Sequence, residues 1–177
     1  MPSKHTFNCK PIGELIERIV GNGKGWIDPF SGFNSPAEWT NDLNPDAPTI
    51  FHIEAIEFIR KMQILRDEKI CVPGFPLPQW NDEFKGCIFD PPYSLTQVSR
   101  SYNDFGIKGW NKNNPTGAFA DVKDAVAKLL PVGGKTIYFG WNTVGFGKGR
   151  GFEIDEIMIV SHGGNRNDTL ITVEIKK

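Results

Sequence analysis

Short apolar segments alternate with amphipathic segments along this chain, and that alternation limits its fold more than any other feature. Apolar residues recur at helical spacing in the segments 11–20, 54–62 and 118–130. Segments typical of strands lie at 26–28, at 49–53, at 86–90 and at 133–141, and residues 40–45 look like the end of a further strand. Strands that alternate with helices predict an α/β domain with a mostly parallel sheet and helices on both faces.

The last part of the chain has a different pattern. Residues 153–175 contain two further strand-like segments with a Gly-Gly turn region between them, which predicts an antiparallel hairpin. A length of 177 residues fits a single domain with one sizeable core. We therefore expect one domain over residues 1–177, built on one sheet that ends in this hairpin.

The bulk composition narrows the classes of function. The net charge is −1 and the pI is about 6.3, which argues against a protein that coats nucleic acid but not against an enzyme with a local basic patch. No apolar run is long enough for a membrane span and no apolar leader is present, so we expect a cytoplasmic protein. The cysteines Cys9, Cys71 and Cys87 lack the spacing of a metal site, so we expect small buried side chains and no metal.

Acidic residues stand where the predicted strands end. Asp28 and Asp90 end two of these strands, and Asp42 and Glu54 lie at or just past the ends of two others. In open α/β sheets, ligands bind at the carboxyl ends of the strands. Carboxylates gathered there repel one another unless they bind a ligand with many hydrogen-bond donors. We therefore expect this rim of the sheet to be a binding site.

The segment "IDPFSG", residues 27–32, has some features of a nucleotide-binding loop. Gly32 lets the backbone approach a ligand, although no further glycine follows at the G-x-G-x-x-G spacing. A carboxylate after the second strand, here Asp42, can bind the hydroxyls of a ribose. Each segment taken alone is also consistent with an ordinary turn.

The segment "DPPY", residues 90–93, is more specific. An amino group on an aromatic base is a poor nucleophile because its lone pair is delocalised into the ring. The Asp90 carboxylate and the Pro91 carbonyl could each accept one of its hydrogens and so localise the lone pair. Pro91 and Pro92 fix the backbone and remove competing N–H donors, and Tyr93 can stack on the base. The pattern predicts catalysis on an amino group by a preorganised polar site.

These residues also give the chain a resemblance to a known family. Residues 90–93 resemble the [DNS]-P-P-[YFW] motif of S-adenosylmethionine-dependent amino-methyltransferases, whose aspartate form is typical of enzymes acting on N6 of adenine in DNA. The segments "FNCKPIGELIERIV", "IDPFSG", "NDLNP" and "FHIEAIEFI" resemble that family's cofactor motifs. Residues 140–177 resemble the tail of compact adenine methyltransferases from phages and mobile elements. The resemblance implies a Rossmann-like methyltransferase sheet, S-adenosylmethionine as cofactor, DNA as partner, and the cytoplasm of a bacterium or a phage-infected host.

The resemblance assigns roles to individual residues. It implies that the catalytic residues are Asp90, Pro91, Pro92 and Tyr93. It implies that the cofactor-binding residues are Lys10, Pro11, Asp28, Pro29, Phe30, Gly32, Asp42 and Glu54. The chain departs from the family pattern at Phe33 or Asn34, where a second glycine is usual. The segments between motifs are too short for an ordinary target-recognition domain, so residues 1–177 are expected to be a single catalytic domain.

A polar segment that starts just after Tyr93 is a candidate for contact with DNA. Residues 95–117 hold three basic residues against one acid, together with three aromatic residues that could stack on bases. The candidate DNA-binding residues are Arg100, Tyr102, Lys108, Trp110 and Lys112. Because the target amine is buried in a duplex, its base must be flipped out, and this segment could hold the opened strand.

Two alternatives stay open from the sequence. Related catalytic motifs serve enzymes that methylate RNA or protein amides. A domain that keeps the fold without catalysis would bind nucleic acid or another partner; the intact "DPPY" segment argues against this interpretation, and the altered glycine motif argues for it. Homodimerisation is also open, because a second copy would add the contacts that so short a chain lacks.

Overall fold

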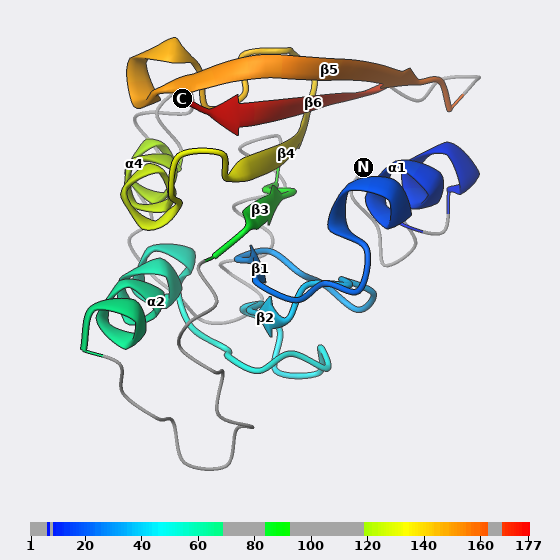
Figure 1. The fold of residues 1–177 in the computed structure, drawn as a ribbon. Helices are drawn as coiled ribbons and strands as arrows, with labels where there is room; N and C mark the ends of the chain where they lie inside the picture. Colours follow the sequence, from blue (N-terminus) through cyan, green and yellow to red (C-terminus); the bar gives the residue numbers. More distant parts are fainter. Residues whose placement is uncertain (1–6, 8, 69–83, 93–118, 163–167) are drawn as a thin grey trace, which may run out of the picture.

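The computed structural model describes residues 7, 9–68, 84–92, 119–162 and 168–177 of the chain. These residues form a six-stranded sheet with the order β2-β1-β3-β4-β6-β5 (Figure 1). The strands are β1 (Trp26–Asp28), β2 (Trp39–Thr40), β3 (Gly86–Phe89), β4 (Lys135–Gly140), β5 (Phe152–Val160) and β6 (Thr169–Lys176). The helices are α1 (Lys10–Val20), α2 (Ala55–Glu68) and α4 (Ala120–Leu129), with a short 3-10 helix η2 (Lys148–Arg150).

The direction of the strands confirms the predicted sheet. Strands β2, β1, β3 and β4 are mutually parallel. Strand β6 is antiparallel to both of its neighbours, β4 and β5. The sheet is therefore mostly parallel and closes with the C-terminal hairpin that the Gly-Gly region predicts.

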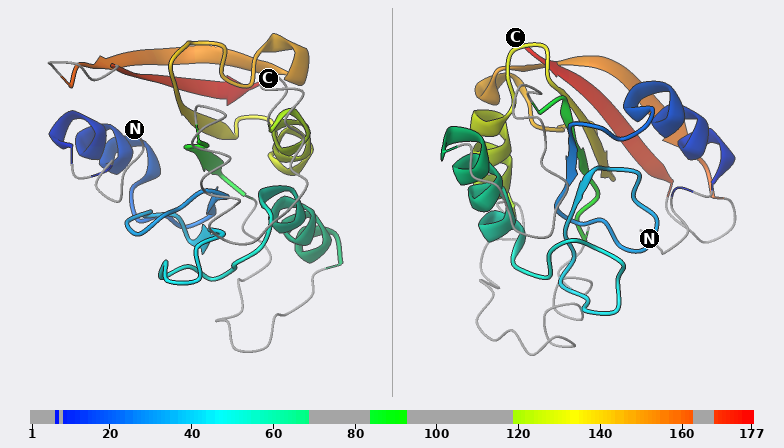
Figure 2. Two further views of the ribbon diagram at one scale, coloured as in Figure 1. Left: turned by 180° about the vertical axis from the view of Figure 1, so that it is seen from behind. Right: turned by 60° about the horizontal axis from the view of Figure 1, so that its bottom comes forward.

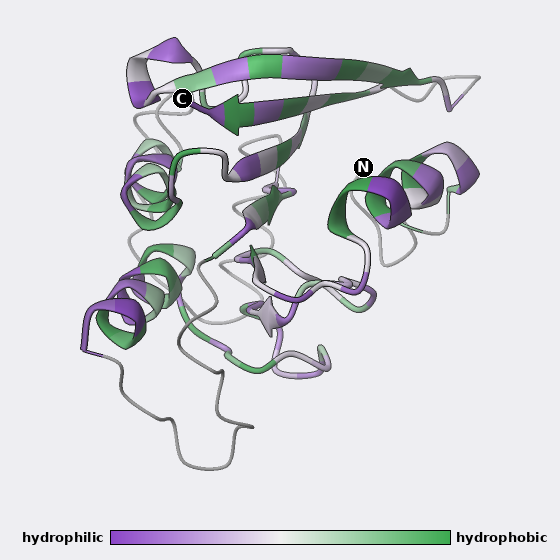
Figure 3. Cartoon of the chain, viewed as in Figure 1, coloured by the Kyte–Doolittle hydropathy of each residue, from purple (hydrophilic) through white to green (hydrophobic). Residues whose placement is uncertain are grey.

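Helices cover both faces of the sheet, as the alternating pattern predicts. Helix α1 lies on one face, and α2 and α4 lie side by side on the other (Figures 1 and 2). The chain carries hydrophobic and hydrophilic residues on different sides of each helix (Figure 3). Phe58, Met62, Val122 and Val126 belong to the core under α2 and α4. Each face of the sheet is thus covered by a separate apolar layer, so a polar ligand is expected to bind at the ends of the strands.

Helix α1 is bounded by its own sequence. Pro11 lies in the first turn, where a missing N–H costs no intrahelical hydrogen bond, and Gly21 ends the helix with a φ of +61°. Ile12 and Ile16 face the sheet and are buried. Arg18 donates to both carboxylate oxygens of Glu156 at 2.9 and 2.7 Å, which ties α1 to β5.

Two expected elements differ in the structure. Residues 49–53 do not form a strand. Among the described residues, their backbone makes one isolated β-bridge, in which Phe51 pairs with Asn41, the residue after β2. The helix expected at 54–62 continues to Glu68, because its last turns pack on α4: Gln63 donates to the Ala125 carbonyl at 2.9 Å. Cys87 is buried in β3 as expected, Cys9 is half-buried, and Cys71 lies outside the described residues.

In the part of the chain that the structure describes, none of the helices combines the length and apolarity that a membrane crossing requires.

Candidate functional site

The strand order creates a switch point between β1 and β3. From β1 the chain adds β2 on one side, and it later adds β3 and β4 on the other. The parallel register pairs Trp26 with Gly86 and Ile27 with Cys87, so β1 and β3 end at the same edge of the sheet. Asp28 is the last residue of β1, and Asp90 follows the last residue of β3. Ligands of open α/β sheets bind at such a switch point, beyond the carboxyl ends of the strands.

Asp28 is fully buried and holds the turn that follows β1. Its two carboxylate oxygens accept hydrogen bonds from the Phe30 N–H at 2.9 Å and from the Ser35 hydroxyl at 2.6 Å. Burial raises the pKa of Asp28 to about 7 against the opposing effect of these two bonds, and the charges of Asp90 and Asp42 add to the rise. The negative charges of Asp42 and Asp90 thus act on Asp28 at this edge of the sheet.

Two buried polar residues that sequence reasoning missed join the turns after β1 and β2. The Ser31 hydroxyl donates to the Asp28 carbonyl at 2.8 Å, and the Ser31 N–H donates to the Asn41 carbonyl at 3.0 Å. The Asn41 side chain donates to the carbonyls of Pro29 and Ile53 at 3.1 and 3.0 Å and accepts from the Ile53 N–H at 3.1 Å. Their only signal in the sequence is a small polar residue in each turn that follows a predicted strand. They fix the positions of the two turns relative to each other.

Asp42 is fixed by backbone donors on both of its oxygens. The Gly32 N–H donates to one oxygen at 2.9 Å, and the Asn44 N–H donates to the other at 2.8 Å. Gly32 has a φ of +56°, and a β-carbon at this position would meet no other atom within 4 Å. The two residues thus bring together an oriented carboxylate and an open space against the backbone, which is the combination expected for a ribose-containing ligand.

Phe30 and Glu54 complete this side of the site. The Phe30 ring makes edge-to-face contacts with Phe89 at 5.1 Å and with Phe119 at 4.9 Å between centroids, so it connects β1's turn to β3 and to the start of α4. Glu54 is half-buried just before α2, where its carbonyl accepts the Phe58 N–H at 2.9 Å. The structure therefore gathers Asp28, Phe30 and Glu54 around the ends of β1 and β2, together with Pro29, Gly32 and Asp42.

The segment predicted to be catalytic begins at the end of β3. Asp90 and Pro91 are buried, and Pro92 is half-buried. Burial is the main cause of the raised pKa values of Asp28 on β1 and of Tyr138 on β4. The negative charge of Asp90 adds to both rises. Tyr93 lies outside the described residues. The Asp90 carboxylate therefore lies buried at this edge, next to the end of β1.

Lys10 and Pro11 differ from this group because their side chains are exposed to solvent. Both are exposed in the first turn of α1, and the Lys10 ammonium is 3.9 Å from the Glu14 carboxylate. The Lys10 side chain is 86% exposed, so the structure gives it no ordered contact with the acids at the strand ends. Its assignment to the cofactor stays a prediction.

The candidate DNA-binding residues Arg100, Tyr102, Lys108, Trp110 and Lys112 lie outside the described residues, so their assignment also stays a prediction.

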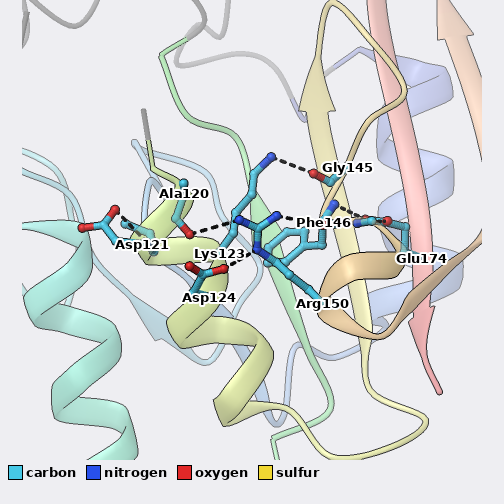
Figure 4. A network of polar contacts seen from close by, with 10 residues as sticks. Ala120, Asp121, Lys123, Asp124, Gly145, Phe146, Arg150 and Glu174 are labelled. Atoms are coloured by element: carbon cyan, nitrogen blue, oxygen red, sulfur yellow. Dashed lines mark hydrogen bonds and ion pairs between the residues drawn. The ribbon is translucent and has the colours of Figure 1, made fainter. Parts of the chain in front are cut away.

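A polar network on α4 borders the site and was not predicted from the sequence (Figure 4). The Lys123 ammonium donates to the Gly145 carbonyl at 2.7 Å and lies 4.1 Å from the centre of the Tyr138 ring. The buried Glu174 carboxylate accepts the N–H groups of Phe146 and Gly147 at 2.7 and 2.8 Å. The network fixes the loop after β4, the strand next to β3. The sequence gives only a weak indication of this role for Lys123, which is a lysine on an otherwise apolar face of the helix.

Comparison by sequence finds no match among models of protein families or among curated proteins. Comparison by structure finds similar folds. SMU.776, assigned as a methyltransferase and complexed with SAH, matches with a TM-score of 0.50 and 10% identity over 93% of this chain and 49% of that one. TrmN from Thermus thermophilus matches with a TM-score of 0.47 and 16% identity over 94% of this chain and 48% of that one. The N-methyltransferase NodS from Bradyrhizobium japonicum WM9 matches with a TM-score of 0.47 and 10% identity over 96% of each chain.

The fold is that of S-adenosylmethionine-dependent methyltransferases: an α/β Rossmann-like sheet, mostly parallel, with a C-terminal antiparallel hairpin. The chain spans about half the length of SMU.776 and of TrmN. At these identities the likeness concerns the fold, and the chemistry of this chain depends on its own residues.

Proposed function

We propose that this chain transfers a methyl group from S-adenosylmethionine to the exocyclic N6 amine of adenine in DNA. The observation that carries the proposal is the position of Asp90 and Pro91, both buried directly after β3 and next to the end of β1. A buried carboxylate followed by a rigid Pro-Pro backbone has the acceptors and the preorganisation that an amino group requires.

The residues at the ends of β1 and β2 fit this cofactor. Each oxygen of Asp42 accepts one backbone N–H, and a carboxylate oxygen can accept a second hydrogen bond, so both remain able to bind ribose hydroxyls. The open space at Gly32 admits a ligand close to the backbone. When bound, the cofactor supplies a methyl group on a positively charged sulfonium. A positive charge suits a region that contains Asp28 and Asp42.

Asp90 and Pro91 act on the amine itself in this proposal. The Asp90 carboxylate and the Pro91 carbonyl each accept one amine hydrogen, which localises the nitrogen lone pair and aims it at the methyl carbon. The N–C bond would form as the S–C bond breaks, the sulfur would keep the S–C electron pair as a neutral thioether, and one amine proton would pass by way of the Asp90 carboxylate to solvent. A single acceptor or donor of this kind in a preorganised site contributes about 10²- to 10³-fold in turnover.

DNA is proposed as the substrate because the aspartate form of the motif at residues 90–93 resembles that of adenine-N6 enzymes acting on DNA. Flipping the base costs a few kcal/mol of stacking and pairing. Arg100, Lys108 and Lys112 are proposed to bind phosphates, while Tyr102 and Trp110 are proposed to stack on exposed bases.

A methyl-transfer assay tests the proposal. The purified chain is incubated with S-adenosylmethionine carrying a labelled methyl group and with unmethylated duplex DNA, RNA of the same sequence, or a mixed protein substrate. We expect label in DNA alone, and we expect digestion to nucleosides to yield N6-methyladenine. Label in RNA or protein would change the substrate class. Binding of the cofactor without transfer to any of the three would instead indicate a domain that keeps the fold without catalysis.

A further inference from the structure

Tyr138 stands on β4 directly beside the last residue of β3. The parallel register pairs it with Phe89, which precedes Asp90. Its ring stacks on the Phe89 ring, with centroids 6.1 Å apart and an interplanar angle of 25°. The side chain therefore lies on the sheet face that α2 and α4 cover, next to the catalytic segment.

The ring extends along β4 toward the carboxyl edge of the sheet. A β-carbon at Gly140 would lie 2.6 Å from Cε1 and 3.0 Å from Oη of Tyr138, so the ring occupies the space above Gly140. Gly140 is the last residue of β4. Continuing the parallel register by two residues from Phe89 and Tyr138 places Gly140 at the level of Pro91. The Tyr138 hydroxyl thus reaches the same edge as Asp90 and Pro91.

Lys123 also holds the ring in this position. The Lys123 ammonium lies 4.1 Å from the ring centre and donates to the Gly145 carbonyl at 2.7 Å (Figure 4). A cation over an aromatic face is attracted by the ring, and a partly buried one more strongly than an exposed one. Contacts with Phe89, Gly140 and Lys123 together leave the ring little freedom, so its hydroxyl is a preorganised polar group.

The hydroxyl is available to a ligand as a donor. Tyr138 is half-buried, and within the described residues its hydroxyl makes no hydrogen bond. Burial raises the pKa of Tyr138, and the charges of Asp90 and Glu174 add to the rise, so the group stays protonated at neutral pH. A neutral phenol beside Asp90 can offer its hydrogen to an acceptor on the same substrate whose amine Asp90 receives.

We propose that the Tyr138 hydroxyl donates a hydrogen bond to a ring nitrogen of the target adenine, next to its amine, and so positions the base for Asp90. The inference rests on the proposed function. In adenine the amine lies between two acceptor nitrogens: N1, bonded to the carbon that bears the amine, on the Watson–Crick edge, and N7, one bond further away, on the Hoogsteen edge. A donor close to the acceptors at Asp90 and Pro91 can engage one of them while the amine is held.

A cycle that combines enzyme and substrate changes tests this. Tyr138→Phe keeps the ring, its stacking and the contact with Lys123, and it removes only the hydroxyl. DNA substrates carry adenine, 1-deazaadenine or 7-deazaadenine at the target position. With adenine, we expect Tyr138→Phe to lower kcat/KM about three- to tenfold, the effect of one neutral hydrogen bond. For the deaza substrate that lacks the contacted nitrogen, kcat/KM relative to adenine should fall more in the wild type than in Tyr138→Phe.

The comparison between the two enzymes removes the intrinsic reactivity of each modified base, because that reactivity is the same for both. Cofactor affinity and the melting temperature should be unchanged by Tyr138→Phe, which distinguishes positioning of the base from a structural role. If both deaza substrates lose the same factor with the wild type and the variant, the inference is overturned while the proposed function stands. A wild type that transfers methyl groups to no adenine overturns both.

Discussion

Asp28 and Asp90 are buried at the carboxyl ends of adjacent parallel strands, on either side of the switch point of the sheet. Burial raises the pKa of Asp28 to about 7, and the charge of Asp90 contributes to that rise. Burial therefore destabilises the ionised form of Asp28, and this residue lies where we propose that a cationic cofactor binds.

The raised pKa of Asp28 predicts how stability depends on pH. The group changes from 3.8 in the unfolded chain to about 7 in the folded one, so between these values the folded state binds more protons. Its stabilising contribution is complete below pH 3.8 and is lost as the pH rises through about 7. The whole loss is on the order of 4 kcal/mol for a shift of this size, and about 3 kcal/mol of it falls above pH 5. Urea unfolding of the wild type and of Asp28→Asn between pH 5 and 8 measures it.

Asp28→Asn carries no titrating group at this position, so its unfolding free energy should decline less over that range than the wild type's. Parallel curves for the two proteins would show that Asp28 titrates normally and would remove the electrostatic coupling from the account.

The open space at Gly32 predicts a variant that loses cofactor binding and little else. Gly32→Ala puts a methyl group where no atom lies within 4 Å, so it causes no clash, but it forces a non-glycine residue to a φ of +56°. That strain costs about 1 to 2 kcal/mol of folding stability. The methyl group would occupy the space that we assign to the cofactor, so binding of S-adenosylmethionine, measured by calorimetry, should weaken at least tenfold.

Gly21→Ala is the matched control. Gly21 has a φ of +61° and also meets nothing within 4 Å, but it ends α1 instead of facing the acids at the strand ends. We expect Gly21→Ala to lose at least as much stability, because the Gly21 ψ of −122° lies outside the left-handed region that alanine can adopt, and we expect a loss of cofactor affinity in Gly32→Ala alone. Equal cofactor affinity in the two variants would move the cofactor away from Gly32.

The short strands and their acids were predictable because local sequence decides them. Trp26, Ile27 and Asp28 form β1 with the expected bounds, since two large apolar residues are followed by an acid and a proline that cannot continue the ladder. The register then brings the end of β1 next to that of β3, which places Asp28 and Asp90 at one edge.

The missed features depend on contacts between residues that are distant in sequence. Residues 49–53 have a strand-like pattern, but the Asn41 side chain takes the N–H and the carbonyl of Ile53, so tertiary contacts replace a strand ladder. Likewise, nothing local to Tyr138 reveals that Phe89, Lys123 and Gly140 surround its ring.

The basic residues of the segment 95–117 predict the salt dependence of DNA binding. Replacing Arg100, Lys108 and Lys112 with alanine should weaken binding of a short duplex, and the slope of log K against log salt should become shallower by up to about 0.9 for each phosphate that is no longer neutralised. Fluorescence anisotropy over a series of salt concentrations measures both effects, and cofactor affinity should be kept.

The control for this charge change is Lys24, Lys85 and Lys128 replaced together with alanine. All three are exposed, and Lys24 and Lys85 precede the amino ends of β1 and β3, at the edge of the sheet opposite the candidate site. The control should leave the salt slope close to that of the wild type. If the two triple variants lose DNA affinity equally, the effect reflects net charge, and the segment 95–117 is not the DNA-binding surface.

The most direct test of the account separates turnover from cofactor binding in one variant, Asp90→Ala. The Asp90 carboxylate is assigned to the amine and not to the cofactor, so single-turnover methylation of duplex DNA should slow by about 10²- to 10³-fold. In the same preparation, the dissociation constant for S-adenosylmethionine should stay within about threefold of the wild-type value, since no hydrogen bond to the cofactor is removed. Methylation at a rate close to that of the wild type would contradict the central claim that Asp90 holds the target amine.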